Sequence, residues 1–132
     1  MDKEKFLDFV NWTKLKVRIH FSKQKQKYFK EREIWWASLG MNIGYEQDGK
    51  HNRFERPVLI LRVFNFEVLW ILPLTGKDKT EKHYYQFEYN GKKSSVILSQ
   101  IRLISSKRLI RKIRTLPEDQ FLDIKTLIKN YL

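Results

Sequence analysis

The fold of this chain is decided by "RPVLILRVFNFEVLWILPLT", residues 56–75, where two apolar runs flank a short turn. Both runs are rich in Val, Ile, Leu and Trp, which is typical of strands buried in a sheet. Little more than Asn65 separates them, so we expect a tight antiparallel hairpin. Pro57 opens the first strand, where its missing N–H costs the sheet no hydrogen bond, and it keeps Arg56 extended.

Further strands are expected on both sides of this hairpin. "EIWWASLG" (33–40) predicts a short aromatic strand, and "QIRLI" (100–104) predicts another. "HYYQFEYNGKKSSVIL" (83–98) carries Asn90-Gly91 between two strand-like runs, which is the strongest short-range signal of a hairpin. Several short strands of this kind indicate a small, strongly curved sheet or barrel.

A helix is expected at each end of the chain. "LPEDQFLDIKTLIKNYL" (116–132) predicts a closing helix with Pro117 in its first turn. Residues 3–29 contain no glycine or proline and place Phe6, Val10, Val17, Phe21 and Tyr28 on one helical stripe. The alternative is a half-buried strand over "KLKVRIHF" (14–21), where apolar and polar residues alternate. The fold class is therefore α+β, mainly β, with an added N-terminal helix.

The chain is strongly basic along its whole length. Its 132 residues are 42% hydrophobic, enough for one domain with a real core. It has 27 basic and 15 acidic side chains, a net charge of +12. Residues 1–32 contain 10 basic and 4 acidic ones, so the excess is not confined to a tail. This balance predicts a polyanionic partner, either nucleic acid or an acidic protein.

Several classes of protein are disfavoured by composition. The chain contains no cysteine, which rules out disulfides and thiolate metal sites. Its histidines, His20, His51 and His83, do not have ligand spacing, so we expect no metal site and no cofactor. It has no apolar run of about 18 residues and no secretory signal pattern. We therefore expect no membrane span and a cytoplasmic location.

The polar stretch "NIGYEQDGKHNRFERP" (42–57) is the candidate functional segment. Gly44 and Gly49 bracket a loop that carries Glu46 and Gln47, and basic side chains follow up to the start of the strand. A guanidinium on a stiff strand end beside a flexible basic loop suits phosphate recognition, because its donors match two phosphate oxygens. The alternative is that this arginine only caps its strand in an ion pair with Glu55 or Glu67.

The order of these motifs resembles the PemK/MazF family of toxin ribonucleases. The resemblance rests on "EIWW", "GYEQDG", "RP" before a buried strand, "PLT", and "QIR" followed by "KRL". It covers residues 31–132 and leaves residues 1–30 as a basic helical extension. It implies an SH3-like barrel of the CcdB/MazF type and a homodimer that binds single-stranded RNA across its dimer face. A cognate antitoxin with an acidic segment would be the second partner.

The resemblance also implies a chemistry and a set of site residues. The ribose 2′-OH would attack the adjacent phosphate without a metal, leaving a 2′,3′-cyclic phosphate and a 5′-OH. The family's essential arginine and threonine fall on Arg56 and Thr75, and its loop carboxylate falls on Glu46, the candidate base. The expected RNA contacts are Gln47, Lys50, His51, Arg53, Lys77, Ser99 and Gln100.

Each of these assignments has an alternative in the sequence. His51 is a rival acid or base because its usual pKa is near neutral. The alternative for Thr75, next to Gly76, is a turn residue, and the alternative for Glu46 is to cap the loop or pair with Lys50. Some family members carry an acidic residue where Ser99 stands here, so slow or altered catalysis is one expectation.

The wider function also has alternatives. A gyrase poison like the CcdB toxins and a non-catalytic RNA-binding module both fit the same fold. Six bases between positions 102 and 114 suit an acidic antitoxin segment or RNA. The extension suits three roles: lengthening the RNA track, bracing the dimer or covering the sheet.

Overall fold

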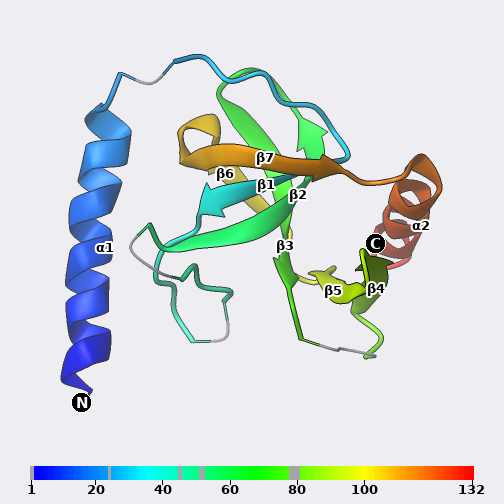
Figure 1. Ribbon diagram of the computed structural model, residues 1–132, viewed down its shortest axis with the longest axis horizontal. Helices are drawn as coiled ribbons and strands as arrows, with labels where there is room; N and C mark the ends of the chain where they lie inside the picture. The colour runs from blue at the N-terminus through cyan, green and yellow to red at the C-terminus, as the bar shows by residue number, and fades with distance from the viewer. Residues whose placement is uncertain (1, 24, 45, 51–52, 78–80) are drawn as a thin grey trace.

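The computed structural model describes residues 2–23, 25–44, 46–50, 53–77 and 81–132 (Figure 1). Its seven strands pair antiparallel, in the order β4-β5-β3-β2-β1-β7, and β6 pairs with β3 off this path. The strands are β1 (Glu33–Ser38), β2 (Glu55–Val63), β3 (Val68–Thr75), β4 (Tyr84–Tyr89), β5 (Lys92–Ile97), β6 (Arg102–Ser105) and β7 (Leu109–Thr115). The predicted mainly β fold with a helix at each end is confirmed.

The sheet is curved but does not close. One edge of β3 pairs with β2, while the other pairs first with β6 and then with β5. The end strands of the order, β4 and β7, are not hydrogen-bonded to each other. They nevertheless approach, because the guanidinium of Arg114 on β7 lies 3.7 Å from the ring centroid of Tyr89 on β4. Side chains therefore bridge the gap that the backbone leaves.

The predicted hairpin of β2 and β3 is confirmed and forms the centre of the sheet. Val58 pairs with Pro73, and the Asn65 side chain accepts hydrogen bonds from the backbone of Glu67 and Val68 in the turn. Both faces of β2 are buried, which explains its continuous apolar run. Successive β2 side chains alternate between two core clusters, one with Leu59 and Leu61, the other with Val58 and Ile60.

The predicted β4–β5 hairpin and the closing helix are also confirmed. Asn90 and Gly91 both have positive φ, 50° and 78°, as this hairpin turn requires. Helix α2 (Glu118–Lys129) begins directly after Pro117. It buries Phe121 and Ile124 in the core cluster that contains Leu59. This helix covers the face of the sheet that contains Leu59.

Helix α1 (Lys3–Phe21) is shorter than the predicted 3–29, and the alternative strand over 14–21 is not formed. Figure 1 shows α1 standing beside the sheet, with the following chain crossing back over the molecule. This return segment, residues 25–32, is held by Phe29, which packs against the core, and by Arg32, whose backbone N–H donates to Ile60 O. The helix ends at Phe21 because the chain must turn back to reach these contacts.

One aromatic side chain anchors α1 to the sheet. Trp12 is the helix's buried residue, and it lies against Phe54 at 5.8 Å and under the Arg108 guanidinium at 5.4 Å. A Cβ at Gly40 would lie 1.9 Å from the Trp12 ring, so only glycine fits there. Most of the predicted apolar stripe faces away from the sheet, with Phe6, Val17 and Phe21 more than half exposed.

Strand β7 was not predicted from the sequence, which indicated only a cluster of bases there. Two register shifts in its pairing with β1 break the alternation that would reveal a strand. The strand separates the bases: Lys112 pairs with Glu33 at 3.0 Å, while Arg111 and Arg114 stack on aromatic rings. Arg108 is half-buried, and burial, aided by nearby Arg102, lowers its pKa to about 10. Several of the six bases therefore have a contact with a neighbouring side chain.

Candidate functional site

Arg56 and Thr75 meet at the open end of the β2–β3 hairpin. The register that pairs Val58 with Pro73 places Arg56 opposite Thr75 when it is continued by two residues. Arg56 Nη1 donates to Leu74 O at 3.0 Å, directly beside Thr75. Both side chains line two adjoining hollows of about 510 and 810 Å³. The structure therefore brings together the two residues on which the sequence prediction depended.

Arg56 is held by oxygen atoms of the loop and the neighbouring strand. It is only 7% exposed, and its Nε donates to Asp48 O while Nη1 donates to Leu74 O. With its amide oxygen facing the guanidinium, Gln47 accepts from Nη2 at 2.7 Å. Glu55, one of the two expected ion-pair partners, instead contacts Arg111 at 3.5 Å. Arg56 is therefore fixed by neutral oxygens rather than by a salt bridge with Glu55.

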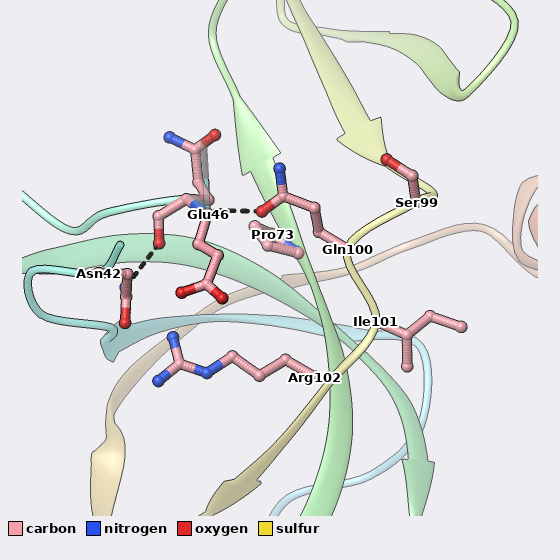
Figure 2. Close-up of a pocket in the computed structure, with 8 residues that line it drawn as sticks. Asn42, Glu46, Pro73, Ser99, Gln100, Ile101 and Arg102 are labelled. Atoms are coloured by element: carbon pink, nitrogen blue, oxygen red, sulfur yellow. Dashed lines mark hydrogen bonds between the residues drawn. The ribbon is translucent and has the colours of Figure 1, made fainter. Parts of the chain in front are cut away.

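The loop that covers Arg56 is itself fixed at several points. Asn42 Nδ2 donates to Gln47 O at 2.9 Å, and Gln47 N donates to Gln100 Oε1 at 2.8 Å (Figure 2). Gly49 lies so close to Phe54 O that a Cβ would come within 1.5 Å of it. Gln47 therefore acts as a support for Arg56, with its side chain and its backbone both engaged.

Burial changes the electrostatics of this arginine. It lowers the pKa of Arg56 from its usual range, and the carboxylate of Asp48 opposes that shift. An arginine stays protonated despite such a shift. A cation removed from water attracts a phosphate more strongly than an exposed one, because the local dielectric constant is lower.

Thr75 ends β3 in a half-buried position, opposite Ser95 of β5. Its Oγ1 accepts a hydrogen bond from Lys77 N at 3.3 Å. The hydroxyl is the acceptor in this bond and therefore keeps its proton for another partner. Thr75 can therefore accept a hydrogen bond in the turn and still donate its hydroxyl proton in the site.

Glu46 lies on the exposed side of the loop and lines the larger hollow together with Arg56 and Thr75. Its Oε1 accepts from Ile43 N at 3.2 Å. Glu46 also lines an adjoining pocket of about 600 Å³, where its carboxylate points toward Arg102 (Figure 2). Burial lowers the pKa of Arg102, and the carboxylate of Glu46 opposes this shift. The candidate base thus lines the same hollow as the arginine and the threonine, with Arg102 as its cationic neighbour.

The other predicted site residues divide into three groups. Those that share the larger hollow with Arg56 are Gln47, Lys50, Lys77, Ser99 and Gln100. Arg53 instead lines a separate groove beside α1. His51 lies outside the described residues.

The smaller hollow contains residues that the sequence analysis did not assign to the site. Trp36, Tyr89 and Arg114 line it, and Arg111 stacks on Trp36 at 5.2 Å. Aromatic rings interleaved with bases are typical of surfaces that bind single-stranded nucleic acid. The sequence signal was present in the tryptophan pair, but the meeting of β4 with β7 depends on the curvature of the sheet. His83 and Tyr84 line the larger hollow and were also not assigned to the site from the sequence.

Two further searches concern metals and membranes. Within the described ranges, no three His, Asp or Glu side chains gather as they would around a metal ion. Neither described helix is both long enough and apolar enough to span a bilayer.

Comparison with known proteins gives one family and a consistent set of folds. Residues 30–132 match the model of the "PemK-like, MazF-like toxin of type II toxin-antitoxin system". The Mycobacterium tuberculosis toxin MazF-mt6 has a TM-score of 0.58 at 21% identity, covering 75% of this chain and 94% of its own. MazF from Deinococcus radiodurans has a TM-score of 0.64 at 16% identity, covering 80% and 97%.

A third solved structure is an endoribonuclease in complex with its cognate antitoxin from a mycobacterial species. Its TM-score is 0.55 at 13% identity, covering 78% of this chain and 93% of its own. A search of curated protein sequences finds no match. At these identities the solved structures establish the fold, and the family model establishes membership.

Proposed function

The chain belongs to the PemK-like, MazF-like toxins of type II toxin–antitoxin systems, and we propose that it cleaves single-stranded RNA as a metal-independent endoribonuclease. The observation that carries the proposal is that Arg56 and Thr75 lie at the same end of the β2–β3 hairpin and line one hollow together with Glu46. These three groups supply a cation, a hydroxyl donor and a base, which is the set that phosphodiester transfer to a 2′-OH requires.

The proposed reaction transfers the phosphate within the RNA. The ribose 2′-OH loses its proton to Glu46 and its oxygen bonds to the adjacent phosphorus, while the bond to the 5′ oxygen breaks. The leaving oxygen takes up a proton from water, so the products are a 2′,3′-cyclic phosphate and a 5′-OH. The phosphorane between them carries extra negative charge, which Arg56 stabilises and Thr75 contacts by donating its hydroxyl proton.

The protein contacts of Arg56 leave room for this role. A guanidinium has five N–H groups, and Asp48 O and Leu74 O accept one each from Nε and Nη1. The Gln47 amide oxygen lies 2.7 Å from Nη2 and also within 3.3 Å of Nη1 and Nε, so the second N–H of Nη2 is the one that these bonds leave for a phosphate oxygen. Because the loop sets the orientation of the fork in advance, little entropy is lost when the phosphate binds.

The direct test is cleavage in a chelator. We expect purified protein to cut single-stranded RNA in EDTA and to leave duplex RNA and single-stranded DNA intact, because DNA lacks the attacking hydroxyl. Measurement is by gel electrophoresis of end-labelled oligonucleotides. Strict dependence on added Mg²⁺, intact RNA bound without cutting, or gyrase trapped on DNA would each contradict the proposal.

We also propose a homodimer, in keeping with the RNA-binding mode inferred from the family. An exposed apolar patch supports it, formed by Phe64, Phe66, Trp70 and Leu103 on the β2–β3 turn, β3 and β6. Trp70 pairs with Leu103 across the strands, and the rings of Phe64 and Trp70 are 5.0 Å apart. A contiguous apolar patch of this kind indicates an interaction surface.

Leu103→Lys should convert the dimer to a monomer, because a charge would be buried without a partner within this patch. Light scattering after size exclusion should show a mass near twice 16.2 kDa for the wild type and near 16.2 kDa for the variant. Leu122→Lys is the matched control, since Leu122 is 53% exposed on α2, compared with 56% for Leu103. A variant that keeps the wild-type mass would refute this interface.

The second partner that we propose is an antitoxin with an acidic segment. A structural neighbour was solved as an endoribonuclease with its cognate antitoxin. On this chain Arg111 and Lys112 are exposed on β7, whose outer edge is not paired with another described strand. Acidic residues along that edge would be attracted to both cations.

A further inference from the structure

A groove beside α1 is rich in positive charge. It has a volume of about 480 Å³ and lies between α1, the return segment and the ends of β1 and β7. Its described lining includes five basic side chains and no carboxylate: Arg18, Lys25, Lys27, Arg53 and Lys107. A hollow with this lining attracts an anion, since no acidic group in the lining offsets the field.

The N-terminal extension builds this groove. Arg18, Lys25 and Lys27 all precede residue 30, where the family match begins. The docking of Trp12 sets the position of the helix, and Lys107 Nζ donates to His20 O at 2.7 Å near its end. Burial lowers the pKa of Lys27, as expected for an ammonium that is partly removed from water. The groove is thus a feature of this chain that the family match does not include.

The groove and the hollow that contains Arg56 are both lined by residues of β1. Ser38 lines the groove and Trp36 lines the hollow, and both lie on one face of β1, about 7 Å apart along the strand. Arg111 stacks on Trp36 along the same path, where its guanidinium also contacts Glu55 at 3.5 Å. A chain that leaves the hollow along β1 would therefore reach the groove.

We propose that this groove binds backbone phosphates of the RNA strand on one side of the cleaved phosphate. The inference rests on the proposed RNA substrate, because only an RNA strand that occupies the hollow would extend along β1 to the groove. Five cations, of which Lys27 is partly desolvated, suit phosphates, whose recognition depends on charge rather than on base sequence. The extension would then increase affinity for long RNA without changing the chemistry.

The test compares two double variants of equal charge. Arg18→Gln/Lys25→Gln removes two exposed bases that line the groove, and Lys3→Gln/Lys14→Gln removes two exposed bases of α1 that do not. Binding is measured by fluorescence anisotropy with fully 2′-O-methylated RNA of about 5 and about 15 nucleotides, over a range of salt concentrations. Methylated RNA cannot be cut, so binding is observed separately from cleavage. Thermal unfolding confirms that each variant is folded.

The expected result is selective for the groove and for length. Each lost phosphate contact makes the slope of log K against log salt less steep by about 0.7. The groove variant lacks two bases, so its slope with the long RNA should be less steep by about 1.4. At about 0.1 M salt this is a loss of about 25-fold in affinity. The control variant on either RNA, and the groove variant on the short RNA, should bind as the wild type does.

Three other outcomes overturn the groove proposal, and a fourth overturns only the proposed function. Equal losses in both variants would show an effect of net charge alone, and a loss on the short RNA would show that the groove is part of the central site. If polyglutamate binding is lost in the groove variant while RNA binding is unchanged, the groove takes an acidic polypeptide. Failure of wild-type cleavage with the length effect intact would refute the proposed function and leave the groove as an RNA site.

Discussion

Arg56→Ala should reduce RNA cleavage by more than about 10³-fold, because it removes the cation and the donors that face the phosphorane. Arg56→Lys should retain the charge and still lose about 10²–10³-fold, since an ammonium lacks the planar fork. Single-turnover rates on one oligonucleotide measure both effects. Arg62→Ala, which removes an exposed arginine of the same strand, should cleave at the wild-type rate.

This experiment needs a check on folding, because Arg56 also binds Asp48 O and Leu74 O. Thermal unfolding and the oligomeric mass show whether each variant keeps the native fold. If the alanine variant does not fold, the lysine variant still tests the prediction, because the lysine side chain can reach one of these two carbonyls. A folded Arg56→Ala protein that cuts RNA at the wild-type rate would contradict the role of the guanidinium.

Thr75→Val should lower kcat by about 10²–10³-fold, which is the usual cost of losing one donor to the transition-state charge. Valine keeps the β-branched shape that suits the end of β3 and removes only the hydroxyl. Thr75→Ser restores a hydroxyl and should recover most of the rate. Thr115→Val on β7 is the matched control. If Thr75→Val retains full kcat, or if the loss appears only in KM, Thr75 does not act in the transition state.

The sequence predicted the elements that depend on local pattern. The β2–β3 hairpin is visible in two apolar runs, the β4–β5 hairpin in Asn90-Gly91, and α2 in its stripe and Pro117. Strand β7 could not be predicted because its bulges against β1 disturb the alternation and because bases dominate its composition. The end of α1 could not be placed, since its stop at Phe21 depends on contacts of the return segment.

The candidate site residues were chosen from the sequence, and their arrangement could be predicted only in part. The meeting of Arg56 and Thr75 follows from the hairpin register, which two apolar runs already imply. The burial of Arg56 under Gln47 could not be foreseen, because it depends on how the loop folds back. Arg53 lines another groove because the chain turns at Phe54, whose φ is +49°. Such turns depend on tertiary packing rather than on local sequence.

The most direct measurement is the chemistry of the ends produced in EDTA by the wild type and by Arg56→Ala. Attack by the 2′-OH on a phosphate held between Arg56 and Thr75 predicts a 2′,3′-cyclic phosphate on one fragment and a 5′-OH on the next at every cut. The same sites should be uncut in Arg56→Ala. Fragments with 5′-phosphate and 3′-OH ends, or the same cuts in both proteins, would contradict the proposed mechanism.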